Sequence, residues 1–356
     1  MTTHRDDRNI GFLKAFAIAT LGGRTGSLSE HATLLRYPPG TKGFHRRYER
    51  LLERTKTLQC AYKKQVQEHL QELPGLVLAS FDDTSIRKSG RCFEGQATYF
   101  DHVKGIFYSG YNVCSTALYR AGKVGVVDTE VSSKDETKIA LFQRTVESLC
   151  LESCAPDVFL FDAWYALKPV LGIIEQHHKA YVTRLKSNRL VIFDDERISL
   201  KELAMSIDHN QYTRIVVHGR TFWVIDTTLE LNGLGERRVL ISKDAVFAKS
   251  VFLTTNNRNF STKFVLNLYL KRFSIEVFFK DAKQYLNLET FQCRSRRKWE
   301  LHFVLVQMLH WSIQRRDSIS KTVRKIRDSV DKIMSYINKN AAFLEILDEF
   351  SKRCQT

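Results

Sequence analysis

The fold of this chain is organised around one stretch of sequence, Tyr269-Leu-Lys-Arg-Phe-Ser-Ile-Glu-Val-Phe-Phe-Lys-Asp-Ala-Lys283. The stretch has no glycine or proline, and Thr262 ahead of it is a suitable N-cap, so it predicts the middle of one α-helix. Residues three, four and seven apart share a helix face, which places five polar side chains in or beside one stripe. These are Tyr269, Arg272, Glu276 and Lys283, with Lys280 beside them.

Most of the remaining surface of this predicted helix is apolar, which is typical of a helix packed into a core. Its carboxylate, Glu276, therefore needs a partner, because a buried charge is costly without one. Two interpretations are open at this point. Glu276 forms ordinary helix salt bridges with Arg272 and Lys280, or it is a ligand to a metal ion beside phosphate groups.

Two further carboxylate positions follow short apolar runs. Leu76–Phe81 is followed by Asp82-Asp83-Thr84, and Pro156–Phe161 is followed by Asp162. Such runs between turn signals predict buried strands, and the functional sites of open α/β sheets lie at the carboxyl ends of strands. Asp157, at the start of its strand, is the weaker candidate.

Three carboxylates from two strands and a helix can hold two Mg²⁺ ions, which prefer oxygen ligands and keep water and substrate phosphate in their shell. Paired metal ions activate a nucleophile and stabilise the leaving oxygen in phosphoryl transfer. Neighbouring Lys, Arg and Tyr side chains would bind DNA phosphates. The pattern alone is moderately specific, because many α/β enzymes carry such residues.

The composition favours a DNA-binding protein. The 356 residues are 43% hydrophobic, which is enough for a sizeable core, and the length indicates two or more structural units. There are 55 Lys and Arg residues against 39 Asp and Glu, and the net charge of +16 favours a polyanion partner, most often nucleic acid. The seven scattered cysteines argue against disulfides and structural zinc and for a reducing cytosol. No signal peptide or membrane-spanning apolar run is apparent.

Five segments follow from the pattern of strands, helices and charge. A strand-rich segment stands between the second carboxylate and the central helix, and both ends of the chain are helical and basic. The predicted segments are 1–73, a basic DNA-binding domain or a plain helical bundle; 74–185, the first part of an α/β core; 186–255, a β-rich insertion; 256–298, the core helix with Glu276; and 299–356, a basic helical region.

The chain resembles the DDE transposases of bacterial insertion sequences, specifically the family marked by Y-x2-R-x3-E-x6-K. Tyr269, Arg272, Glu276 and Lys283 match this spacing at all four positions. The acidic motifs Phe81–Thr84 and Phe161–Tyr165 resemble those of the same family, as does the order of two aspartates, a β-rich insertion and a glutamate. The resemblance covers about residues 74–300.

The resemblance implies an RNase H-like core of the retroviral-integrase type, interrupted by the β-rich insertion. It implies Mg²⁺-dependent cleavage of transposon ends, with Mn²⁺ able to substitute, and joining of the freed 3′-OH to target DNA. In this family the first catalytic aspartate usually directly precedes a threonine, which favours Asp83 over Asp82. The catalytic residues and metal ligands implied are Asp83, Asp162 and Glu276.

The expected partner is double-stranded DNA, both the terminal inverted repeats and the target, bound by a homodimer in the cytoplasm and nucleoid of a bacterium or archaeon. The residues expected to contact this DNA are Tyr269, Arg272, Lys280, Lys283, Arg294, Arg296 and Arg297. In this family an aromatic residue of the insertion stabilises a flipped base. Trp223 is a candidate for that role or, alternatively, an ordinary core residue.

Two alternative functions stay open. The first is another RNase H-like nuclease, such as a junction resolvase, although the four matched positions argue against it. The second is a non-catalytic DNA-binding protein derived from a transposase, although the intact acidic positions argue against that.

Overall fold

The structure is a computed structural model of the chain. It describes residues 40–314, apart from 89, 91–92, 102–104, 133–136 and 245–248, and also Phe16 and Thr20. Most of the predicted helical segment before residue 40 and the C-terminal segment after residue 314 therefore lie outside the described residues. No helix in the described ranges is long and apolar enough to cross a membrane.

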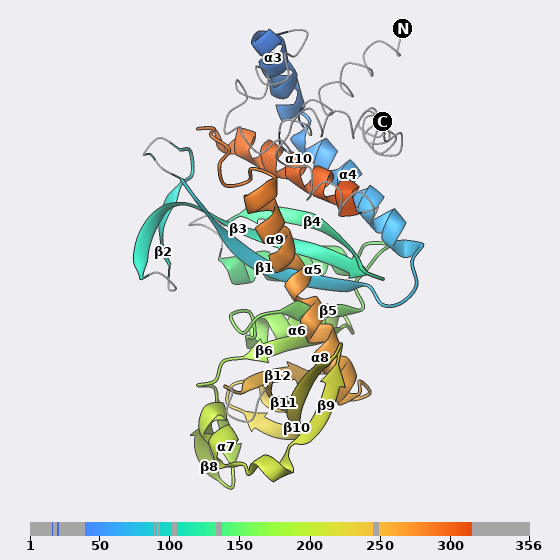
Figure 1. Ribbon diagram of the computed structural model, residues 1–356, viewed down its shortest axis with the longest axis vertical. Coiled ribbons are helices and arrows are strands. Elements are labelled where there is room, and N and C mark those ends of the chain that lie inside the picture. The colour runs from blue at the N-terminus through green and yellow to red at the C-terminus, as the bar shows by residue number, and fades with distance from the viewer. Residues whose placement is uncertain are drawn as a thin grey trace.

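In Figure 1 the first described helices (residues 40–71) and the last described helix (residues 296–314) lie together at one end of the molecule, and a large mixed sheet extends away from them. The strands are β1 (Leu78–Arg87), β2 (Ala97–Asp101), β3 (Ile106–Arg120), β4 (Lys123–Val131), β5 (Val158–Phe161), β6 (Ala180–Leu185), β7 (Leu190–Phe193), β8 (Glu196–Ser199), β9 (Thr213–Val217), β10 (Arg220–Leu231), β11 (Gly235–Lys243) and β12 (Val251–Thr255). The helices are α3 (Gly40–Leu52), α4 (Thr55–Gln71), α5 (Lys138–Cys150), α6 (Lys168–Gln176), α7 (Leu200–Ser206), α8 (Thr262–Lys271), α9 (Phe273–Tyr285) and α10 (Arg296–Gln314), with a 3₁₀ turn, η1, at His209–Gln211. The predicted α/β class is confirmed.

β1 is the centre of the part of the sheet that carries the acidic residues. β3 pairs with it antiparallel on one side and is followed by β4, while β5 and then β6 run parallel to it on the other side. β12 pairs antiparallel with β6 and leads to β11, β10, β7 and β8. The strands between residues 190 and 255 therefore continue the same sheet.

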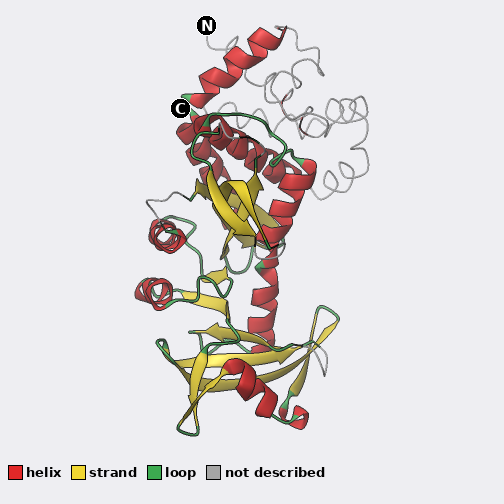
Figure 2. Cartoon of the chain, turned by 90° about the vertical axis from the view of Figure 1, so that its left-hand side faces the viewer, coloured by secondary structure: helices red, strands yellow, loops and turns green. Residues whose placement is uncertain are grey.

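Helices cover both faces of the central strands (Figure 2). On one face the Phe142 ring of α5 stacks on Phe81 of β1, with centroids 4.0 Å apart, and α6 lies beside α5. On the other face α9 packs on β1, and α8 packs on β5 and β6. Trp299 of α10 packs there on Tyr111 of β3. Burial of such rings contributes about 1.5–3 kcal/mol each to the free energy of folding.

The predicted single helix is two helices that meet at Arg272. The backbone of Arg272 stays helical (φ −52°, ψ −38°), but its amide donates to the Tyr269 carbonyl three residues back, at 3.1 Å. This tighter turn ends α8 and starts α9. The N-cap is Ser261 and not Thr262, because the Ser261 hydroxyl accepts from the Phe264 amide at 3.2 Å.

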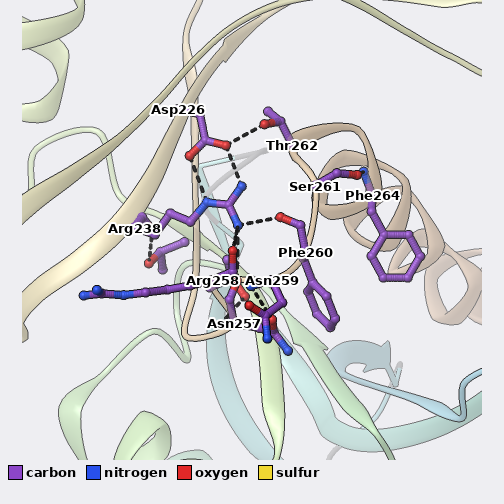
Figure 3. Close-up of polar contacts among 11 residues, drawn as sticks. Asp226, Arg238, Asn257, Arg258, Asn259, Phe260, Ser261, Thr262 and Phe264 are labelled. Atoms are coloured by element: carbon purple, nitrogen blue, oxygen red, sulfur yellow. Dashed lines mark hydrogen bonds and ion pairs between the residues drawn. The ribbon is translucent and has the colours of Figure 1, made fainter.

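An ion pair ties β10 and β11 to the start of α8 (Figure 3). Arg238 of β11 donates to both carboxylate oxygens of Asp226 on β10, at 2.9 and 2.6 Å, and to the Phe260 carbonyl at 2.6 Å. Thr262 donates to the same carboxylate at 2.6 Å. Burial acts to raise the pKa of Asp226, but these hydrogen bonds outweigh it and lower that pKa. The β-rich segment is therefore fastened to the helix that carries Tyr269.

Candidate active site

Asp82 and Asp83 point to opposite faces of the sheet. Both lie within β1 and not at its end, since β1 continues to Arg87, but the parallel pairing of β1 with β5 stops at Ser80. Side chains alternate along a strand, and Phe81 packs on α5. Asp83 therefore shares the face covered by α5, and Asp82 shares the face covered by α9.

The Asp82 carboxylate contacts the start of α9 through Arg272. Asp82 Oδ2 lies 3.3 Å from Arg272 Nη1, and Arg272 Nη2 lies 2.6 Å from Glu276 Oε1. The guanidinium is buried against two rings, with its Cζ 5.5 Å from the Tyr269 centroid and 4.6 Å from that of Phe273. Of the two helix salt bridges considered from the sequence, the pair of Glu276 with Arg272 is present and no pair with Lys280 is found among the described residues. The Arg272 cation also joins Glu276 to a carboxylate of β1.

Asp162 follows β5 directly, as predicted, and lies beside Asp82. β1 and β5 pair with Ser80 opposite Leu160, so two further steps along both strands place Asp82 next to Asp162. Burial raises the pKa of Asp82 to about 7; Arg272 opposes this rise, while Asp162 and Asp83 add to it. The two carboxylates are thus close enough for each charge to oppose the other, and only Asp82 is paired with the buried Arg272.

Asp83 is held by three donors on the other face. Its carboxylate accepts hydrogen bonds from Lys138 Nζ at 2.6 Å, Asn112 Nδ2 at 2.8 Å and the Tyr165 hydroxyl at 2.6 Å. The sequence-based choice of Asp83 as the first metal ligand stays a prediction, and in the structure this carboxylate lies on the face opposite Arg272 and Glu276. The physical reason is the alternation along β1, which turns Asp83 away from the helix that carries Glu276.

The predicted stripe on the central helix divides into buried and exposed positions. Tyr269 and Arg272 are buried, whereas Glu276 and Lys280 are exposed. Lys283 is partly buried, and its ammonium donates to the Ser85 carbonyl of β1 at 2.6 Å. Burial lowers the pKa of Lys283. Lys283 therefore fastens α9 to β1, while Lys280 faces solvent.

A cavity of about 540 Å³ lies beside Asp162. Its lining residues are Asp162, Ala163, Arg184, Leu185, Lys186, Ser187, Asn188, Tyr269 and Arg272. The exposed cations Arg184 and Lys186 were missed from the sequence. The available signal was their position at the carboxyl end of the apolar run Ala180–Leu185, because parallel strands end at the same edge of a sheet.

The arginines after α9 lie at the start of α10 and contact the segment before β2. The Arg294 carbonyl accepts from the Glu94 amide at 2.9 Å, and the Arg296 amide donates to the Glu94 carboxylate at 3.1 Å. The Arg296 side chain pairs with Glu300 at 2.8 Å. Arg294 and Arg297 are exposed, and neither lines the cavity beside Asp162.

Trp223 lies on the face of β10 that is turned away from α8. Its ring packs on His209, with centroids 4.8 Å apart. The alternate residue Phe222 faces α8 and lines a cavity of about 350 Å³ together with Tyr269 and Phe273. The predicted alternation along this strand is present, but it is Phe222 that approaches the stripe.

The donor chemistry of the site fits a divalent cation. Among the described residues, no three His, Cys, Asp or Glu side chains converge closely enough to hold a metal ion. Asp82 and Asp162 are nevertheless adjacent, and Glu276 lies on the same face of the sheet. Carboxylate oxygens are the ligands that Mg²⁺ prefers, and Asp82 and Asp162 supply two of them side by side.

Residues 74–312 match a family described as "Transposase DDE domain". This match confirms the resemblance to DDE transposases, while membership of the narrower family marked by Y-x2-R-x3-E-x6-K stays a prediction. A search of curated proteins found no match.

Two solved structures are similar in part. A piggyBac transposase synaptic complex with hairpin DNA is 11% identical and covers 97% of this chain and 72% of its own, with a TM-score of 0.48. The NurA nuclease from Sulfolobus solfataricus is 10% identical and covers 82% of this chain and 97% of its own, with a TM-score of 0.26. Both similarities are too weak to carry an argument about this chain.

Proposed function

Because the chain belongs to the family of proteins with a transposase DDE domain, we propose that it is a DNA transposase that cleaves transposon ends and joins the freed 3′-OH to target DNA. One observation carries the proposal: Asp82 and Asp162 lie side by side, and the buried Arg272 joins Asp82 to Glu276. The strand order β4-β3-β1-β5-β6, with the first three antiparallel and the last two parallel to β1, supports an RNase H-like core.

We assign the acidic triad to Asp82, Asp162 and Glu276, with Asp83 as a supporting residue. Mg²⁺, or Mn²⁺ in its place, would be held by these carboxylates and would supply activation of the attacking oxygen and stabilisation of the leaving oxygen. The chain itself holds the two aspartates on adjacent strands. The bonds of Asp83 to Lys138 and Tyr165 fix the backbone of β1 from the opposite face.

DNA is bound by the exposed cations of this face. Lys280 on α9 lies one helical turn after Glu276, and Arg184 and Lys186 line the cavity beside Asp162. Such side chains position DNA through its phosphates without reading sequence. Lys283 acts indirectly, by holding α9 on β1.

We propose that the five segments predicted from the sequence have separate roles. Residues 74–185 and 256–298 form the catalytic core, and residues 186–255 form an insertion that continues its sheet. The basic ends, 1–73 and 299–356, bind DNA and support a homodimer on paired transposon ends, with the exposed Arg294 and Arg297 beside them. The bond of Arg238 to Asp226 supports a role of the insertion in placing α8.

We propose Phe222, and not Trp223, as the aromatic residue of the insertion that contacts distorted DNA. Phe222 lines the cavity that also contains Tyr269 and Phe273, whereas Trp223 packs on His209. Apolar and aromatic side chains are suited to fill the space of an unstacked base.

The function is tested with the full chain, a DNA duplex that carries the inverted repeats flanking its gene, a target plasmid and Mg²⁺. The expected result is cleavage at the repeat ends followed by covalent joining of those ends to the plasmid. Cleavage without joining would indicate an RNase H-like nuclease. Repeat binding without cleavage would indicate a non-catalytic protein derived from a transposase.

A further inference from the structure

Trp164 exposes its ring at the carboxyl end of β5. The residue is 52% exposed, whereas Trp299 and Trp311 are buried in the core. The tryptophan ring has a large apolar area and is highly buried on average. An indole left open beside an acidic pair is therefore a candidate for contact with a ligand.

The main chain holds Trp164 next to Asp162. Its amide donates to Asp162 Oδ1 at 2.8 Å, so one turn presents both the carboxylate and the indole. The following residue, Tyr165, is buried and anchored by its hydrogen bond to Asp83 at 2.6 Å. The indole is thus fixed through its backbone while its ring stays open to solvent.

Two lysines lie over the indole. Lys186 Nζ is 5.1 Å and Lys138 Nζ is 6.0 Å from the ring centroid, which is the range of cation–π contacts. Lys138 is also paired with Asp83 at 2.6 Å. Lys186 is exposed and lines the cavity beside Asp162 together with Arg184, so its charge is available to an anion.

We propose that Trp164, Lys186 and Arg184 bind one unpaired nucleotide of the DNA next to the phosphodiester that is cleaved, an inference that rests on the proposed function. The base stacks on the indole. Its phosphate is bound by Lys186 and Arg184 at the cavity of about 540 Å³, a volume within the usual range of small-ligand sites.

These three side chains would distinguish unpaired DNA from duplex DNA and would not distinguish one base sequence from another. An indole can stack only on a base whose face is free, and in a duplex both faces of each internal base are covered by neighbours. Every base has such a face, so stacking on aromatic side chains tolerates any sequence. The two cations contact phosphate, which is also independent of sequence.

Binding of short oligothymidylate to the full chain in EDTA tests this site. Trp164→Ala is expected to weaken binding about 5- to 150-fold, the value of one stacked base, and Trp164→Phe to retain most of the affinity. Lys186→Ala is expected to reduce the slope of log affinity against log salt by about 0.7. Phe193→Ala and Lys201→Ala remove an exposed aromatic and an exposed lysine from β7 and α7 and should bind like wild type.

Fluorescence supplies a second measurement. Oligothymidylate should quench the tryptophan emission of the wild type, and Trp164→Phe should abolish most of that quenching. Equal affinity of wild type and Trp164→Ala would overturn the proposal. If Trp164→Ala does not fold, the quenching comparison and the salt slope of Lys186→Ala decide, and an unchanged result in both would also overturn it.

The outcome is separable from the proposed function, because no cleavage is measured. If the protein joins DNA ends but binds oligothymidylate equally well with and without Trp164, only this inference is wrong. Binding that depends on Trp164 in a protein that never joins DNA ends would remove the transposase proposal alone.

Discussion

The Arg272 guanidinium lies 3.3 Å from the Asp82 carboxylate, although 190 residues separate the two in the chain. The same group pairs with Glu276 at 2.6 Å. Arg272 therefore holds the strand and the helix of the acidic site together and offsets part of their negative charge. A divalent cation would act on the same carboxylates, so the site should respond to both pH and Mg²⁺.

The first prediction concerns pH. The pKa of Asp82 rises from 3.8 to about 7 in the folded protein, mainly through burial. The folded state thus binds the proton of the Asp82 carboxyl group more tightly than the unfolded state does. The resulting stabilisation of the folded state is full below about pH 4 and is lost as the pH rises through about 7. Thermal melts in EDTA should show this loss, on the order of a few kcal/mol. Asp82→Asn should flatten the dependence of the melting temperature on pH, whereas the control Asp195→Asn, at an exposed position, should leave it unchanged.

The second prediction concerns Mg²⁺. At pH 8 a saturating concentration of Mg²⁺ should raise the melting temperature of the wild type. At a Mg²⁺ concentration of one hundred times Kd, the free energy of unfolding should increase by about 2.7 kcal/mol. Asp82→Asn and Asp162→Asn should lose this stabilisation, because each removes a carboxylate from the pair. Asp83→Asn should keep it. A Mg²⁺ response that vanishes in Asp83→Asn but survives in Asp82→Asn would restore the sequence-based choice.

The third prediction concerns cleavage of end DNA. Asp82→Ala, Asp162→Ala and Glu276→Ala should abolish cleavage while end binding persists, since carboxylates do not attract phosphate. Tyr165→Phe is the matched variant on the other face, because it removes one hydrogen bond to Asp83. It should lower stability by about 1–2 kcal/mol and still cleave. Near wild-type cleavage by Asp162→Ala would show that the acidic pair is not the reaction centre.

The fourth prediction compares two lysines on α9. Lys280 is exposed, whereas Lys283 is bonded to the Ser85 carbonyl. Lys280→Ala should therefore reduce the slope of log duplex affinity against log salt by the value of about one phosphate contact. It should leave the melting temperature unchanged. Lys283→Ala should lower the melting temperature and leave the slope unchanged. The opposite pattern in both variants would mean that Lys283 and not Lys280 contacts DNA.

The fifth prediction concerns the aromatic residues of β10. Phe222→Leu keeps an apolar side chain in the cavity beside Tyr269 but removes the ring, so it should allow the first nick and slow the later steps. Trp223→Ala should mainly lower stability, because that ring packs on His209. Melting curves and single-turnover product analysis separate the two effects. A stable Trp223→Ala protein that stalls after the first nick would reassign the role to Trp223.

Local patterns in the sequence were sufficient to place Asp162 after a strand and Glu276 on a helix, whereas Asp82 and Asp83 lie within β1 and not at its end. Asp162 after a short apolar run, Glu276 on a helix and a strand-rich segment between them all follow from periodicity and turn residues, which depend on near neighbours in the chain. The predicted N-cap is one residue too late, since Ser261 and Thr262 are both able to cap. In the structure the Ser261 hydroxyl accepts from the Phe264 amide, whereas the Thr262 hydroxyl donates to Asp226.

The tertiary structure alone decided which side chains of each strand meet the helices α8 and α9. Alternation along β1 and β10 separates Asp82 from Asp83 and Phe222 from Trp223, but it does not say which face a distant helix will cover. That choice depends on α8 and α9 packing against β5, β6 and β1, contacts between segments up to 200 residues apart in the chain, as the bond from Lys283 to Ser85 illustrates with a separation of 198. Sequence periodicity is a property of one segment, whereas the acidic site is a property of how separate segments pack.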